Sequence, residues 1–266
     1  MEMLSIASGS SGNCYYVGTE NTHLLVDAGI SGKKIENALN EIDIKGSDLD
    51  GILITHEHID HVKGLGVMAR RYGIKIYATA ATINEIKDMI CLGKLDEGLF
   101  HSIKPDAAFD IKDIRVEASS IWHDAADPVC YSMESSGKKI SIATDMGAYD
   151  DYIVEKLKDS DVMVIEANHD IRMLEAGPYP YPLKMRILGN RGHLSNEASG
   201  KLIKSILNNH IRAILLGHLS KENNIPELAY ETVKLELMEN EYTNDVRDLG
   251  LEVAKRDIPG SLISIG

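Results

Sequence analysis

A dense cluster of histidines and a carboxylate constrains this sequence more strongly than any other feature. The stretch T-H-E-H-I-D-H at 55–61 directly follows the apolar run 51–54, which has the composition of a buried strand. Residues two apart point the same way on an extended segment but not on a helix, so His56 and His58 can aim at one point if the backbone is extended. Imidazole and carboxylate are ligands that zinc and similar divalent metals prefer. The stretch therefore predicts a metal centre at the end of a strand, with Asp60 turning onto the next element.

Composition limits the class of protein. The chain has 266 residues, 44% hydrophobic and 26% charged, which is ordinary for a globular domain. The sequence has no apolar run long enough to span a membrane and no signal-like N-terminus, so we expect a soluble, cytoplasmic protein without a membrane partner. Three widely spaced cysteines outside any C-x-x-C pair fit a reducing compartment. The net charge of −13 argues against broad electrostatic binding to nucleic acid, but bound cations and a short basic segment could still support a nuclease.

Strand and helix patterns alternate along most of the chain, with polar residues gathered where strands end. This order predicts an α/β protein, one domain over 1–266, with its site along one edge of a sheet. The expected strands are 3–7, 14–17, 23–26, 51–54, 74–78, 109–119, 129–134, 139–143, 162–165, 213–216 and 251–254. The expected helices are 31–42, 62–72, 81–92, 152–157, 195–208 and 225–240, and the proline-rich stretch 171–194 is expected to be irregular.

Two segments before the metal stretch allow two interpretations each. The Gly/Ser-rich run 8–13 is either a plain hairpin connection or a loop whose backbone N–H groups face an anion, which would make Ser10 a substrate-binding residue. Asp27 either braces the metal loop through hydrogen bonds or caps a turn.

Three further strand ends each carry a potential ligand: His123, Asp145 and His218. Singly, such residues are more often caps or turn residues. Together they supply what the first loop lacks, because Asp145 can bridge two metals while each histidine completes one site. The predicted ligands are His56, His58, Asp60, His61, His123, Asp145 and His218. Two metals held this way could carry a bridging hydroxide at neutral pH.

These motifs resemble those of the metallo-β-lactamase superfamily. Its H-x-H-x-D-H signature matches 55–61, and L-V-D-A-G at 25–29 and T-D-M-G at 144–147 follow in the order that the superfamily uses. The resemblance implies an αββα sandwich, with two facing mixed sheets, helices outside and a binuclear site at one edge.

Details of the motifs point to a subfamily. True β-lactamases of this fold usually carry Cys where Asp145 stands, which argues against β-lactam hydrolysis. R-G-H-L-S at 191–195 resembles the histidine motif of ribonuclease Z-type nucleases, which implies that His193 is catalytic; the alternative is a histidine that merely neighbours a helix N-cap at Ser195. G-H-L-S at 217–220 resembles their final motif and makes Ser220 a substrate-binding candidate.

Five further motifs together most resemble the YycJ-like (WalJ) branch: G-S-S-G-N-C at 9–14, H-D-A-A-D-P-V at 123–129, E-A-N-H-D at 166–170, G-H-L-S-N at 192–196 and H-L-S-K-E-N-N at 218–224. That branch is regarded as exonucleases that degrade DNA in the 5′-to-3′ direction. The resemblance implies a metal-dependent phosphodiester hydrolase with two divalent ions. Zinc is the first choice of metal, with manganese or iron as alternatives. The implied partner is a nucleic-acid substrate, with DNA as the first choice. A hydroxyacylglutathione hydrolase-like enzyme acting on a small thioester or lactone, and a non-enzymatic metal-dependent scaffold or sensor, are the competing hypotheses.

A basic segment supports a nucleic-acid substrate. The range 170–193 carries four basic and two acidic residues, with Tyr179 and Tyr181 between them. The basic residues could bind a phosphate backbone while the tyrosines stack on bases. The alternative is a solvated loop. The catalytic candidates are His193 and Asp60, and the substrate-binding candidates are Ser10, His169, Arg186, Arg191 and Ser220. Asp124 is a possible partner of a ligand histidine. The sequence gives no indication of oligomeric state.

Overall fold

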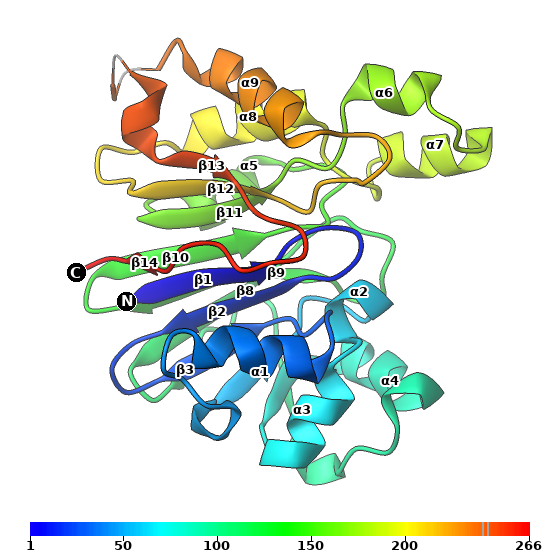
Figure 1. Cartoon of the computed structure of the whole chain (residues 1–266), viewed down its shortest axis with the longest axis vertical. Coiled ribbons are helices and arrows are strands. Elements are labelled where there is room, and N and C mark those ends of the chain that lie inside the picture. The colour runs from blue at the N-terminus through cyan, green and yellow to red at the C-terminus, as the bar shows by residue number, and fades with distance from the viewer. Residues whose placement is uncertain (241, 244) are drawn as a thin grey trace. The chain divides into compact units, whose positions relative to one another are not determined.

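The computed structural model describes residues 1–240, 242–243 and 245–266. The chain forms two compact units (Figure 1). Unit 1 comprises Met1–Ser120, Ala125–Lys138 and Lys255–Gly266, and unit 2 comprises Ile121–Asp124 and Lys139–Ala254. None of the helices in the described ranges is long and apolar enough to cross a membrane.

Unit 1 is built on a mixed sheet. Its strands are β1 (Glu2–Ala7), β2 (Cys14–Gly18), β3 (His23–Val26), β4 (Gly51–Leu53), β5 (Ile76–Thr79), β6 (Phe100–Ile103) and β14 (Ile263–Ser264). They lie in the order β14-β1-β2-β3-β4-β5-β6, antiparallel from β14 to β3 and parallel from β3 to β6. A separate antiparallel group contains β7 (Phe109–Ile111), β8 (Ile114–Ser120) and β9 (Val129–Ser135). The parallel part therefore places the ends of β3 and β4 side by side.

The helices of unit 1 are α1 (Gly32–Asn40), α2 (Ile59–Val62), α3 (Leu65–Tyr72) and α4 (Ala80–Asp88). Helix α1 begins where the hydroxyl of Ser31 accepts a hydrogen bond from the Lys34 N–H. Its residues Ile35 and Leu39 share one face and are fully buried in the core that the sheet strands also line. Burying this apolar face is what fixes the helix onto the sheet.

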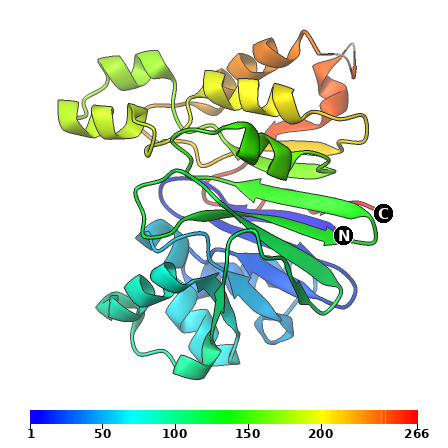
Figure 2. The ribbon, with the colours of Figure 1, turned by 180° about the vertical axis from the view of Figure 1, so that it is seen from behind.

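Unit 2 contains four parallel strands: β10 (Lys138–Ala143, whose first residue belongs to unit 1), β11 (Val162–Glu166), β12 (Ala213–Gly217) and β13 (Leu251–Val253). The two central strands, β11 and β12, are buried along their whole length, as expected of parallel strands covered by helices. The helices are α5 (Asp151–Leu157), α6 (Ile171–Ala176), α7 (Tyr181–Leu188), α8 (Asn196–Ile206) and α9 (Pro226–Leu237). Helix α8 packs against both α5 and α9, and Figure 2 shows α5 alongside α8.

Three details of the predicted secondary structure are wrong. The stretch 171–194 is not irregular, because α6 and α7 lie within it; Pro180 occupies the N-cap of α7 and Pro182 its first turn, where a fixed φ and a missing N–H are tolerated. The single strand expected over 109–119 is the β7–β8 hairpin, which turns at Lys112 with φ 50°. The helix expected over 62–72 is α3 alone, preceded by the separate turn α2.

Gly29 joins two segments of unit 1 that meet without space for a side chain. A Cβ atom on Gly29 would lie 1.6 Å from the Asp60 carbonyl oxygen, whereas the Gly29 N–H donates to the Asn13 carbonyl oxygen at 2.8 Å. Close backbone approach of this kind requires glycine. The position of the 55–61 stretch therefore depends on Gly29.

We expect Gly29→Ala to displace the 55–61 backbone and to lower the unfolding temperature by about 5–10 °C, as overpacking by about 2–3 kcal/mol would do. Thermal unfolding followed by circular dichroism measures the shift. Gly98→Ala is the matched control, because the added methyl group would contact only the Asp96 carboxylate at an ordinary 3.4 Å. An equal, small shift in both variants would contradict the close approach described here.

Candidate metal centre

The stretch 55–61, which we call the histidine loop, begins where β4 ends. Its first half is extended up to His58, whose φ and ψ are −57° and 145°, and its second half forms the first turn of α2. His56 and His61 are fully buried, while His58 and Asp60 are partly exposed. The predicted change from extended to helical backbone within the loop is confirmed.

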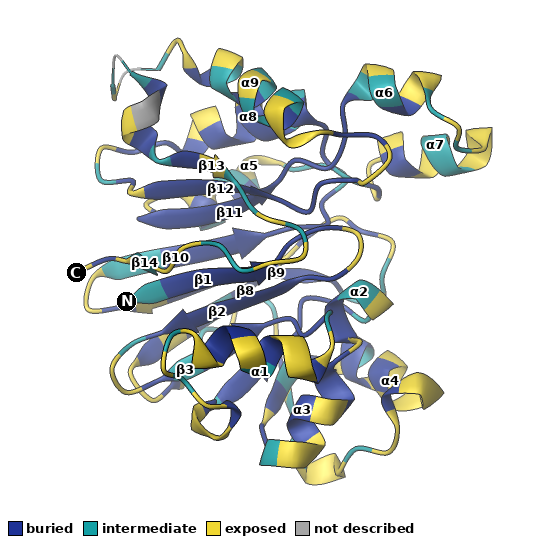
Figure 3. Cartoon of the chain, in the orientation of Figure 1, coloured by how far each residue is buried: buried dark blue, intermediate teal, exposed yellow. Residues whose placement is uncertain are grey.

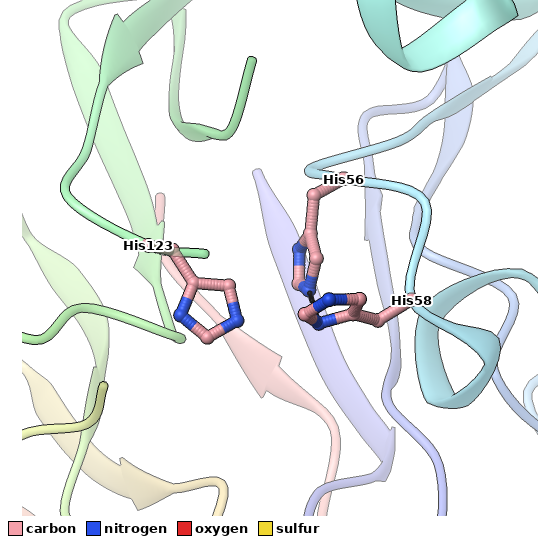
Figure 4. A group of neighbouring side chains, drawn as sticks. All are labelled: His56, His58 and His123. Atoms are coloured by element: carbon pink, nitrogen blue, oxygen red, sulfur yellow. Dashed lines mark hydrogen bonds between the residues drawn. The ribbon is translucent and has the colours of Figure 1, made fainter. Parts of the chain in front are cut away.

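His56 and His58 converge on one point. Their rings are turned toward each other (Figure 4), with His56 Nε2 and His58 Nδ1 3.1 Å apart. Two nitrogen ligands of one tetrahedral ion, each at 2.0–2.1 Å from it, would be about 3.3 Å apart. The two histidines are therefore already spaced as neighbouring ligands of one metal.

Asp27 fixes which nitrogen each buried histidine presents. Its carboxylate accepts hydrogen bonds from Thr55 N (2.9 Å), from the Thr55 hydroxyl (2.9 Å) and from His61 Nδ1 (2.7 Å). The Thr55 oxygen lies 3.0 Å from His56 Nδ1 and, with its own proton given to Asp27, accepts from it. Both rings therefore carry their proton on Nδ1 and a lone pair on Nε2, the tautomer that a metal requires. The predicted bracing role of Asp27 is confirmed.

Burial of the Asp27 carboxylate disfavours its charged form, and nearby hydrogen bonds offset this effect. Complete burial raises the pKa of the Asp27 carboxyl above its usual value, whereas the bonds from His61 and Thr55 act in the opposite direction. The backbone at Asp27 is left-handed, with φ 60°, which Asp tolerates better than most residues.

The Gly/Ser-rich run 8–13 is the connection of the β1–β2 hairpin, which bears out the plainer of its two interpretations. Its last residue contacts the histidine loop: Asn13 N donates to the Asp60 carbonyl oxygen at 2.8 Å, and Asn13 Nδ2 donates to His61 Nε2 at 3.1 Å. Ser10 is exposed, and its hydroxyl oxygen lies 3.4 Å from the Arg256 guanidinium. Its predicted contact with substrate stays a prediction.

Unit 2 holds a second cluster at the ends of three parallel strands. Oxygen or nitrogen atoms of Asp145, Glu166, His193 and His218 lie within 4.8 Å of one another. Asp145 follows β10, Glu166 ends β11 and His218 follows β12, so the parallel sheet itself brings them together. Asp145 and His218 have left-handed backbones, with φ 60° and 52°.

Glu166 is the centre of this cluster. Its Oε1 accepts from His193 Nδ1 (2.7 Å) and His218 Nδ1 (2.9 Å), and its Oε2 accepts from Met146 N (2.8 Å) and Leu194 N (3.2 Å). Burial alone would raise the pKa of Glu166, but the charge of His193 and the hydrogen bonds from His193 and His218 lower it to about 2. Glu166 is therefore a buried carboxylate that holds both rings with their protons on Nδ1.

His193 is charged more readily than an ordinary histidine. Burial opposes its protonated form, but the charge of Glu166 and the hydrogen bond to it raise the pKa of His193 above the usual value. His169 is the opposite case, because its burial lowers its pKa to about 4. Within the described residues, neither ring nitrogen of His169 has a hydrogen-bond partner.

His123 follows β8 and is also drawn in Figure 4. Its Nδ1 donates to the Gly192 carbonyl oxygen at 3.1 Å, which leaves a lone pair on Nε2. Asp124 lies beside this ring, with Oδ1 3.4 Å from His123 Nε2, and its other oxygen accepts from Arg186 Nε. Arg186 is therefore already paired, whereas Arg191 is exposed. The Ser220 hydroxyl accepts from Asn223 N at 3.2 Å within its own turn.

The donors fit divalent metals in each unit. Of the predicted ligands, His56, His61, His123 and His218 all have Nδ1 bonded to an acceptor, as metal-binding histidines do. Sequence reasoning missed Glu166, Thr55 and Asn13. The sequence held one signal for Glu166, a carboxylate closing the fully apolar strand V-M-V-I-E.

Comparison with known proteins gives the family. The sequence family described as a beta-lactamase superfamily domain matches residues 22–218. The chain belongs to the metallo-β-lactamase superfamily. The resemblance predicted from the sequence motifs is confirmed.

Two curated relatives cover most of the chain. Exodeoxyribonuclease WalJ of Streptococcus pneumoniae is 45% identical over 228 residues, 86% of this chain and 85% of that protein. Exodeoxyribonuclease YycJ of Bacillus anthracis is 40% identical over 234 residues, 88% of each chain. Among solved structures, Zn²⁺-bound PqqB from Methylobacterium extorquens matches with a TM-score of 0.71 at 14% identity over 100% of both chains. The predicted fold class, an αββα sandwich, is confirmed by this likeness of fold.

We expect Asp27→Asn to weaken metal binding by about 10- to 100-fold, because an amide cannot accept from Thr55 and His61 as a carboxylate does. Competition with a chromophoric chelator measures the affinity. Asparagine is the chosen replacement because it tolerates the left-handed backbone at this position. Asp113→Asn is the control, since Asp113 is a carboxylate of unit 1 that accepts hydroxyl bonds from Thr19 and Thr22 away from the histidine loop. Unchanged affinity in Asp27→Asn would refute the bracing role.

Proposed function

We propose that this chain is a metal-dependent phosphodiester hydrolase that degrades DNA as an exonuclease, in the 5′-to-3′ direction. The observation that carries the proposal is the pair Glu166–His193, a proton donor held beside potential metal ligands. The two relatives named exodeoxyribonucleases support it, because they align with 86–88% of the chain. A DNA substrate is also the reason to propose a cytoplasmic location.

The metal ligands that we propose are the seven predicted from the sequence, His56, His58, Asp60, His61, His123, Asp145 and His218. Together they would hold two divalent ions, zinc first, because imidazole with a few carboxylates suits zinc, and manganese or iron as alternatives. The family match spans residues of both units, which supports a single metallo-hydrolase domain over 1–266.

Divalent ions held by these donors would supply Lewis-acid chemistry, lowering the pKa of a water molecule and offsetting the charge of the phosphate. The chain supplies the remaining parts. Glu166 keeps the Nδ1 proton of His193 in place, so the proton that His193 can give to a leaving oxygen is the one on Nε2. The raised pKa of His193 keeps that proton in place to a higher pH than in an ordinary histidine. Asp60 is proposed as a ligand that also orients the nucleophile, and Ser10, His169, Arg186, Arg191 and Ser220 as residues that contact substrate.

Three substrates separate this function from hydrolysis of a small ester. Purified protein should hydrolyse bis(p-nitrophenyl) phosphate and end-labelled single-stranded DNA, and leave a lactone intact. We expect His58→Ala to lose metal and turnover together, and His193→Ala to lose about 10²–10⁴-fold in turnover while retaining metal, because a proton donor contributes about that factor.

Metal content by mass spectrometry and a circular-dichroism spectrum accompany each assay. Hydrolysis of the lactone without either phosphodiester would refute the proposed function and favour a thioester or lactone hydrolase. Loss of metal from His193→Ala equal to that from His58→Ala would make His193 a ligand. Oligonucleotides labelled at the 5′ or the 3′ end distinguish the direction of degradation.

Glu166→Gln tests how the proton is held. Glu166 raises the pKa of His193, and His193 loses its proton as pH rises through that pKa, so the variant should lose activity at lower pH than the wild type. The alkaline limb of kcat against pH on bis(p-nitrophenyl) phosphate measures the shift. Because Glu166 also bonds His218, the comparison uses protein with equal metal content. An alkaline limb that does not move would contradict the assigned role of Glu166.

A further inference from the structure

Helix α7 exposes an apolar stripe in unit 2. Tyr181, Met185 and Leu188 are spaced by four and three residues, so they share one face of the helix. Their exposed fractions are 73%, 48% and 38%, which is unusual for three large apolar side chains on one short helix. Figure 3 shows α6 and α7 mostly exposed, in contrast to the buried strands β11 and β12. The stripe is therefore available to a partner.

The segment that contains this stripe is basic in a chain that is acidic overall. Arg172, Lys184 and Arg191 lie on or beside α6 and α7. One of the two acidic residues between 170 and 193, Asp170, caps α6 by accepting a hydrogen bond from Met173 N at 2.7 Å. Lys184 Nζ donates to the Glu175 carbonyl oxygen, a neutral acceptor, at 2.6 Å. The charge of this segment is thus complementary to a phosphate backbone, against a net charge of −13 for the chain.

The C-terminal end of α7 contacts the turn that carries the proposed proton donor, His193. The His193 N–H donates to the Ile187 carbonyl oxygen at 3.0 Å, and the Gly192 N–H donates to the Gly189 carbonyl oxygen at 2.8 Å. A Cβ atom on Gly192 would lie 2.1 Å from the Ile187 oxygen, so the turn packs on the end of α7 with no space for a side chain. The end of α7 therefore lies next to the backbone of His193.

We infer that the exposed face of α7, with Tyr181, Met185 and Leu188 as base-contacting residues and Arg191 as a phosphate contact, binds single-stranded DNA and positions it for hydrolysis. This inference rests on the proposed function. Aromatic and apolar side chains stack on unpaired bases without regard to sequence, and a duplex does not offer its base faces to them. Eight helical residues span about 12 Å, the length of three to four nucleotides at about 3.4 Å each.

The test measures binding separately from turnover. Metal-loaded protein is titrated against a fluorescent phosphorothioate oligonucleotide, which resists hydrolysis, and anisotropy gives the dissociation constant. We expect Tyr181→Ala with Met185→Ser to weaken binding about 5- to 100-fold, the loss of one stacked base. Arg191→Ala should reduce the slope of log K against log salt concentration by about 0.7, the value for one phosphate contact on a single strand.

Exposed residues elsewhere in unit 2 supply matched controls: Leu235→Ser and Met238→Ser on and beside α9, and Lys201→Ala on α8. We expect the ratio of kcat/KM on DNA to kcat/KM on bis(p-nitrophenyl) phosphate to fall at least about 5-fold in the α7 variants alone. Binding within a factor of about two of the wild type in the α7 variants, or equal losses in the controls, would overturn the inference.

Two further outcomes keep this inference distinct from the proposed function. Wild-type protein that hydrolyses bis(p-nitrophenyl) phosphate but does not bind the oligonucleotide overturns the α7 surface and leaves the phosphodiesterase standing. Binding that depends on α7, without hydrolysis of any phosphodiester, would support the α7 surface and overturn the proposed phosphodiesterase. A wild-type dimer that becomes monomeric on Tyr181→Ala, with unchanged DNA binding, would instead assign the stripe to a second copy of this chain.

Discussion

The site depends on sharp turns made at strand ends by residues other than glycine. Asp27, Asp145 and His218 each follow a strand and have φ of 60°, 60° and 52°. Such conformations cost about 1–3 kcal/mol each and persist only where surrounding bonds fix them. Asp27 is held by Thr55 and His61, and His218 by Glu166. The same bonds that compensate the strained backbone therefore aim the functional side chains.

The first layer of the site was predictable because it follows from local rules. Alternation along an extended segment places His56 and His58 together, and parallel strands end at the same edge, which gathers Asp145 and His218. The role of Glu166 was not predictable in this way. A glutamate at the end of an apolar strand looks the same in sequence whether it meets water or two histidines, and its partners His193 and His218 lie 27 and 52 residues away.

The least accurate prediction was the stretch between residues 171 and 194, and the reason is instructive. Three prolines in this stretch suggested irregular backbone, yet proline is favoured in the first turn of a helix, where its N–H would have no partner. Pro180 and Pro182 therefore start α7 instead of breaking it. The helix is short and largely exposed, so hydrophobic periodicity, which reports burial, gave little indication of it.

Gly192 links two functions of one backbone turn. Its carbonyl oxygen orients His123, its neighbour is His193, and its missing side chain lets the turn close against the end of α7. The α6–α7 hairpin is thus anchored at one end by Asp170 N on the Asn223 carbonyl oxygen and at the other by this turn. A side chain introduced at Gly192 would therefore disturb two histidines at once, His123 through the carbonyl oxygen that it bonds and His193 through the adjoining backbone.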